Sequence, residues 1–125
     1  MRKQYHFRPS GEGLHAWDVD RLIDLAADLP NAEVALSSVN ELDSDYWFDH
    51  GHAPTVRAIV EHVRLIASAD LSCAIILDPD GRVMDGMHRV AKALLEGRPV
   101  VTAKRLTTMP PPDFSDVQPD DLPYG

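Results

Sequence analysis

The stretch AIILDPDGRVMDGMHRVAKALLEG, residues 74–97, constrains the fold of this chain more than any other. A short apolar run precedes the turn sequence DPDG and then RVMD, which is typical of two antiparallel strands joined by a tight turn. Apolar residues then recur at helical spacing, and Gly97 lies where a helix would end. The hairpin must therefore pass directly into the helix, through a strand-to-helix corner at Asp85-Gly86-Met87-His88-Arg89.

The remaining segments predict further helices mixed with strands. Residues 18–29 are expected to form an amphipathic helix with Asp18 as its N-cap and Pro30 as its stop. After Pro54 comes the most regular helical pattern of the chain. Its apolar residues share one face: Val56, Ile59, Val60, Val63, Ile66 and Ala67. Strands are expected over residues 3–9, 33–39 and 99–106.

Strands and helices that alternate irregularly indicate an α+β fold. The prediction is a single domain with a small mixed sheet and about three helices. It covers residues 1–106, with a core over about 33–106 and residues 1–30 as an extension. Residues 107–125 are rich in proline and acidic residues, so we expect a tail that is disordered or ordered only by contact.

Charge and composition exclude several classes of protein. The chain has 12 Lys and Arg against 20 Asp and Glu, a net charge of −8, which disfavours extended nucleic-acid contact. No apolar run approaches the roughly 20 residues that cross a bilayer, and no apolar segment follows the basic N-terminus as in a signal peptide. The single cysteine, Cys73, fits a reducing compartment and is expected in the core. We therefore expect a cytoplasmic protein.

The residue types at the corner, residues 85–89, allow two interpretations. It is either an ordinary helix cap with charged surface residues or a site that binds an anion. The first turn of a helix has backbone N–H groups without partners and a partial positive charge, so it attracts anions. Gly86 permits close approach, and Arg89 has a planar fork that suits phosphate or carboxylate. His88 can donate a hydrogen bond or a proton. Asp85 would repel a phosphate, so it is either a helix cap or a ligand of a metal–nucleotide complex.

The segment IILDPDGRVMDGMHRVAKALLEGRPVVTAKRL resembles the core of the ParB/sulfiredoxin superfamily, and MDGMHR resembles the DGHHR corner of its free-serine kinases. That resemblance implies a ligand with a phosphate group, a nucleotide in particular, bound by Gly86, Met87, His88 and Arg89. It also implies Mg²⁺ as a cofactor that arrives with the nucleotide. VALSSVNE resembles another region of the family, which would place Glu41 near the site as a catalytic carboxylate beside Asp85 and His88.

The resemblance further implies phosphotransfer or nucleotide hydrolysis, or the nucleic-acid association of ParB-like nuclease domains. Sulfiredoxins have a cysteine where this chain has Met87, so repair of cysteine sulfinic acid is excluded. ParB partition proteins add a helix-turn-helix domain for which these 125 residues leave no room, so centromere binding is not implied.

Other polar and aromatic residues allow further interpretations. His50 and His52, next to Asp49, could ligate a metal, although such spacing in a polar loop arises easily by chance. Tyr46-Trp47-Phe48 is either a cluster against the core or a protein contact surface, the latter giving a non-catalytic interaction module. If the loop that contains them folds over the corner, His62 or Glu61 of the following helix would reach it.

Overall fold

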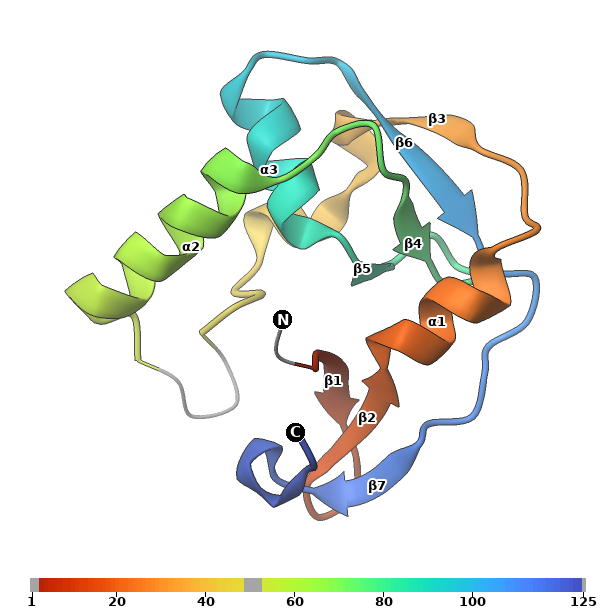
Figure 1. Cartoon of the computed structure of the whole chain (residues 1–125), viewed down its shortest axis with the longest axis vertical. Helices are drawn as coiled ribbons and strands as arrows, with labels where there is room; N and C mark the ends of the chain where they lie inside the picture. The colour runs from red at the N-terminus through yellow and green to blue at the C-terminus, as the bar shows by residue number, and fades with distance from the viewer. Residues whose placement is uncertain (1–2, 49–52, 125) are drawn as a thin grey trace.

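The computed structural model describes residues 3–48 and 53–124 of the chain (Figure 1). His50 and His52 lie outside the described residues. The elements in chain order are β1 (Tyr5–Pro9), β2 (Leu14–Asp18), α1 (Val19–Ala26), β3 (Ala32–Ala35), α2 (Val56–Ser68), β4 (Ile75–Leu77), β5 (Val83–Asp85), α3 (Met87–Leu95), β6 (Val100–Arg105) and β7 (Phe114–Val117), with short 3-10 turns at Leu36–Ser38, Asn40–Asp43 and Pro119–Asp121.

A four-stranded mixed sheet with the order β3-β6-β4-β5 organises the fold. β4 and β5 form the predicted antiparallel hairpin, and Gly81 adopts a φ of 86° in its turn. β6 returns parallel to β4 after α3, and β3 pairs with β6 in antiparallel register. The predicted α+β class is therefore confirmed, with helices and strands mixed along a single small domain.

Helices cover both faces of this sheet because side chains alternate along its strands. On one face, Ile75 and Leu77 of β4 contact α3. On the other face, Ile76 contacts α1. The α3 side contains the larger core cluster: Leu36, Val39, Ile75, Leu77, Val83, Met87, Val90, Ala93, Val101 and Ala103. The α1 side contains the smaller one: Trp17, Leu22, Ala26, Ile76, Met84 and Leu106.

A second, antiparallel sheet with the order β1-β2-β7 lies beside the first (Figure 1). The sequence patterns did not predict β2. It has only five residues and runs without a turn into α1, so no boundary separates the strand from the helical pattern. β7 belongs to the proline-rich tail and pairs with β2. Trp17 adds a second attachment, since its Nε1 atom donates to the Pro110 carbonyl at 2.9 Å. The tail is thus held by main-chain pairing and by a buried indole.

α1 and α3 begin where their sequences indicate. The Asp18 side chain accepts from the Asp20 N–H at 2.9 Å, as expected of an N-cap. α1 ends at Ala26 rather than residue 29, and Ile23 is about half exposed. In α3, Val90 is buried as expected, but Leu94 is exposed, and Ala93 takes the inward position that its spacing did not single out.

α2 packs against α3 and contributes little to the core. α2, which is described throughout, contains no buried residue. The exposed fractions of Val56, Ile59, Val60 and Val63 are 80%, 46%, 42% and 56%. Half-buried residues lie on a different stripe of the helix: Ala58, His62 and Ile66. Apolar spacing correctly predicted this helix, but the face it defines is turned toward solvent except at Ile66.

Two further expectations concern burial and the membrane. The expected core position of Cys73 was wrong, because its side chain is exposed in the loop that precedes β4. Across residues 3–48 and 53–124, none of the helices has the length and apolar character needed to cross a membrane.

Candidate functional site at the β5–α3 corner

Gly86 forms the bend between β5 and α3 and is the N-cap residue of α3. Its φ of 101° lies in the left-handed region, which favours glycine. A Cβ atom at this position would lie 2.6 Å from the Cγ2 atom of Ile75, inside the core. Gly86 is therefore required by backbone conformation and packing. As a glycine it also contributes no capping side chain to the first N–H groups of α3.

Asp85 and Arg89 lie on either side of this bend. The Arg89 Nη1 atom is 3.5 Å from the Asp85 carboxylate and 3.4 Å from the Ala74 carbonyl. Burial raises the pKa of the Asp85 carboxyl, and Arg89 and the Gly86 N–H oppose that shift. Gly86, and not Asp85, is the N-cap residue of α3. A distance of 3.5 Å exceeds that of a strong charge-assisted hydrogen bond, so Arg89 is held loosely.

His88 faces α2, where it meets His62. Their facing nitrogens, Nδ1 of His62 and Nε2 of His88, are 2.8 Å apart. The Trp47 ring stacks over both imidazoles, with centroid distances of 4.5 Å and 4.7 Å. Burial lowers the pKa of His88 to about 4, and the neighbouring His62 and Arg89 add to the shift. One ring donates and the other accepts, so the pair cannot carry protons on both facing nitrogens.

The loop that contains Trp47 therefore lies over the corner, and His62 contacts the corner through His88. Glu61 does not reach the corner, because its exposed carboxylate pairs with Arg64 on the same helix at 3.5 Å. Phe48 contacts the edge of the His62 ring, with the two centroids 5.3 Å apart. All three aromatic residues, Tyr46, Trp47 and Phe48, are half-buried and make contacts within the chain.

Glu41 and Tyr46 bind the free edge of β5. The Glu41 carboxylate accepts from the Val83 N–H, and the Tyr46 hydroxyl donates to the Val83 carbonyl at 3.2 Å. β5 is the outer strand of its sheet, so these side chains pair main-chain groups that would otherwise lack partners. Glu41 lies near the corner, as the family resemblance implied, and its carboxylate is bound there to the main chain of β5.

A cavity of about 220 Å³ lies along the face of α3 that runs from Met87 to Leu94. Met87, the first residue of the helix, forms part of its wall, as do Trp47 and Phe48. Its remaining lining residues are Glu41, Leu42, Ser44, Asp45, Tyr46, Ala91 and Leu94. An apolar cavity of this size with aromatic walls suits a planar fragment rather than a whole large ligand.

A buried ion pair links the other sheet to the turn between β4 and β5. Arg8 of β1 donates through Nη1 to Asp78, the residue after β4, at 2.8 Å, and through Nε to His6 at 2.9 Å. Asp78 also accepts from the N–H groups of Asp80 and Arg82, both at 2.9 Å. Although burial alone would raise it, these donors hold the pKa of Asp78 below its usual value. No sequence motif indicated this pair, because its members are 70 residues apart.

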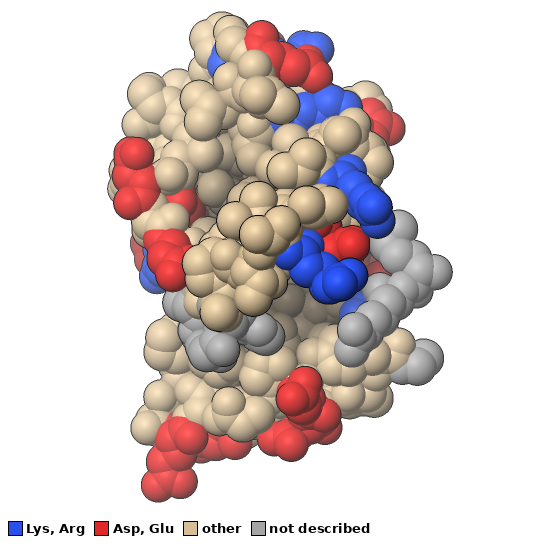
Figure 2. All heavy atoms as spheres, turned by 90° about the vertical axis from the view of Figure 1, so that its left-hand side faces the viewer, with Lys and Arg blue, Asp and Glu red and all other residues tan. Residues whose placement is uncertain are grey.

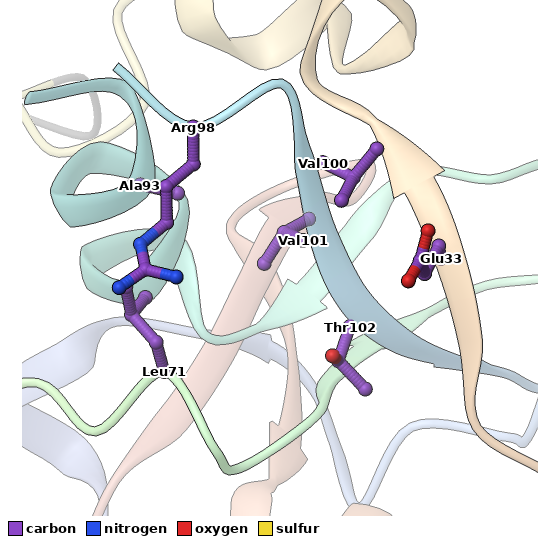
Figure 3. Close-up of a pocket in the computed structure, with 7 residues that line it drawn as sticks. All are labelled: Glu33, Leu71, Ala93, Arg98, Val100, Val101 and Thr102. Carbon is purple, nitrogen blue, oxygen red and sulfur yellow. The ribbon is translucent and has the colours of Figure 1, made fainter. Parts of the chain in front are cut away.

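A second cavity, of about 200 Å³, lies by β3 and β6 (Figure 3). Arg98 and Leu71 lie on one side of it in Figure 3, and Glu33 and Thr102 on the other. None of the residues predicted for the site lines it. The Arg98 guanidinium is paired with exposed Glu96 at 2.9 Å.

The described residues do not provide a ready metal site. Among them, no group of three or more His, Cys, Asp or Glu side chains converges as metal ligands would. Asp85 is paired with Arg89, and Glu41 is bound to Val83. The expected Mg²⁺ therefore stays a prediction.

The chain matches no protein-family model, no curated protein and no solved structure. The resemblance of its corner to the ParB/sulfiredoxin superfamily thus stays a prediction that rests on the motif MDGMHR and the segments around it.

Proposed function

We propose that this protein binds a small phosphate-bearing molecule, and a nucleotide in particular, at the β5–α3 corner. The observation that carries the proposal is the first turn of α3, whose N-cap residue has no side chain to occupy the free N–H groups. Arg89 stands in the same turn. Met87 of this turn also lines the aromatic cavity, so a phosphate and a planar group could be held by neighbouring surfaces.

The loose pairing of Arg89 supports an exchange of partners. Its side chain is 26% exposed and lies 3.5 Å from Asp85, so an incoming phosphate could take two hydrogen bonds from the guanidinium. Asp85 would then lose its counter-charge. Because burial already raises the pKa of that carboxyl, uptake of a proton would relieve repulsion of the phosphate.

Calorimetric titration with ATP, ADP, adenosine and inorganic phosphate, each with and without Mg²⁺, tests this proposal. We expect ATP or ADP to bind, and Arg89→Ala to weaken binding by about tenfold or more, as removal of a charged bidentate donor does. Arg98→Ala is the matched control, since Arg98 lies in the α3–β6 loop and pairs only with exposed Glu96 among the described residues. Absence of binding by every ligand, or equal affinity of both variants, would overturn the proposal.

The proposal extends to phosphotransfer or nucleotide hydrolysis through Asp85. A buried carboxyl group whose pKa is raised is a better candidate for proton transfer than an exposed one. Glu41 fits that role less well because its carboxylate is bound to the Val83 N–H. Release of ADP from ATP by the parent chain, and its loss in Asp85→Asn with ATP binding retained, is the expected result. Equal release by the two proteins would remove Asp85 from the chemistry.

A further inference from the structure

The exposed face of α2 is an unusual surface for a small protein. We name Val56, Ile59, Val60 and Val63 the α2 apolar face. They follow the spacing i, i+3, i+4, i+7, so they form one continuous stripe along the helix. All four are exposed, whereas the helix contacts the rest of the protein through a different stripe. Contiguous apolar surface of this kind marks an interaction site.

Figure 2 shows the side of the molecule on which α2 lies in Figure 1. Uncharged atoms form a continuous area over the middle of this side, with basic groups along one border. Helical spacing places a charged flank next to the α2 apolar face, made of Arg57, Glu61 and Arg64. This flank points away from the half-buried stripe of Ala58, His62 and Ile66. The local charge of this flank is positive, although the chain as a whole carries −8.

We propose that the α2 apolar face binds the same face of a second copy of this chain, with the two α2 helices antiparallel. A two-fold symmetric pair needs a self-complementary surface. In the register where Val56 faces Val63 of the second copy, Ile59 faces Val60 of that copy. Every apolar residue of the face then meets another.

The charged flank selects the antiparallel arrangement. When a two-fold axis relates two antiparallel helices, the charged flanks of both copies lie on the same side of the helix pair. When it relates two parallel helices, the two charged flanks lie on opposite sides of the pair. In the antiparallel register given above, Arg57 lies beside Glu61 of the second copy, and Glu61 beside its Arg57. Two opposite-charge pairs thus flank the apolar contact.

The arrangement of α2 leaves room for a second copy. Its N-terminal half extends away from α3 and the sheets (Figure 1). Lys92 of α3 holds the other end by donating to the carbonyls of Ala67 and Ala69, at 3.1 Å and 2.7 Å. Antiparallel pairing therefore places the two protein bodies at opposite ends of the helix pair. The contact is short, so we expect a concentration-dependent dimer rather than a permanent one.

Sedimentation equilibrium over a concentration series tests the proposal directly. The weight-average mass of the parent chain should rise from 13.9 kDa toward twice that value. Val63→Glu should stay at the mass of a monomer. Leu95→Glu is the control, because Leu95 is 79% exposed on α3, outside the α2 apolar face, and this variant should associate like the parent. A parent chain that stays monomeric throughout would leave the face to a different partner and overturn the proposal.

A charge-exchange experiment tests the register with chains whose apolar face is intact. Arg57→Glu and Glu61→Arg should each weaken self-association, since each places like charges opposite one another. An equimolar mixture of the two variants should form mixed dimers with restored association, because every charged pair is then attractive. Circular dichroism spectra equal to that of the parent confirm that α2 is retained. Mixtures that associate no better than the separate variants would overturn the antiparallel register.

Discussion

The imidazole of His62 on α2 is hydrogen-bonded to that of His88 on α3, with 2.8 Å between Nδ1 and Nε2, and Trp47 covers both rings. This contact ties the outer helix to the first turn of the helix that forms the corner. It holds only while at least one of the two facing nitrogens lacks a proton. The association of α2 with α3 is therefore coupled to pH.

We predict that acidification destabilises the protein through this pair. The pKa of His88 is about 4 in the folded chain and that of His62 is also lowered, so below about pH 6.5 the unfolded chain binds more protons than the folded one. The free energy of unfolding should fall as the pH drops from about 6.5 toward 4, by about 1–2 kcal/mol after solvent screening, and should not depend on this pair at higher pH. Urea unfolding at several pH values in this range should show that the free energy of unfolding depends less steeply on pH in His88→Gln than in the parent chain. Parallel profiles would contradict the prediction.

We predict that Gly86→Ala is among the most damaging substitutions in the chain. It forces a side chain into a left-handed conformation and into Ile75, so the loss of stability should reach about 3 kcal/mol or more. Gly97→Ala is the matched control, since Gly97 also has a positive φ, 72°, but a Cβ atom there meets nothing within 4 Å. It should cost about 1–2 kcal/mol. Equal losses in thermal unfolding would show that packing against Ile75 is unimportant.

We predict that Asp78→Asn lowers stability by about 3–5 kcal/mol, because it leaves the Arg8 guanidinium buried without a counter-charge. Arg8 is already under-satisfied, since its Nη2 atom is buried with no hydrogen-bond partner among the described residues. Asp80→Asn makes the same chemical change at an exposed position of the same turn and should stay within about 0.5 kcal/mol of the parent. Chemical denaturation measures both, and similar midpoints would contradict the prediction.

We predict that Glu41→Ala costs about 1–3 kcal/mol by leaving the Val83 N–H without its partner. Glu41→Gln keeps an oxygen at the same position and should retain most of that stability. A different ranking would indicate that the charge of Glu41 matters more than its hydrogen bond. Hydrogen exchange of the Val83 amide reports directly on the contact and should be faster in the alanine variant alone.

Local sequence patterns predicted the elements that depend on local interactions. Asp18 was correctly predicted as an N-cap, and the DPDG turn correctly placed the β4–β5 hairpin, because capping and turn formation involve residues only a few positions apart. The patterns did not show which face of α2 would be covered. That depends on α3 and on the loop around Trp47, which lie far away in sequence.

The corner itself was only partly predictable. Its bend at Gly86 and the proximity of Arg89 follow from the spacing of residues in a strand and a helix. The partnership of His88 with His62, and that of Glu41 with Val83, join residues 26 and 42 positions apart. The sequence feature that could have pointed to His62 was the aromatic run at residues 46–48, because Trp47 and Phe48 pack against its ring. Nothing local indicated that Glu41 would bind a strand edge.

The pairing of β2 with β7 makes the three-stranded sheet dependent on residues about 100 positions apart, such as Leu14 and Val117. During synthesis on the ribosome, β1 and β2 emerge long before β7, whereas the segments of the four-stranded sheet and of α3 are complete by Arg105. Until residues 114–117 emerge, β2 has an open edge that other chains can pair with. A nascent or proteolytically shortened chain that stops before Phe114 should therefore be prone to aggregation, although its larger core is already encoded.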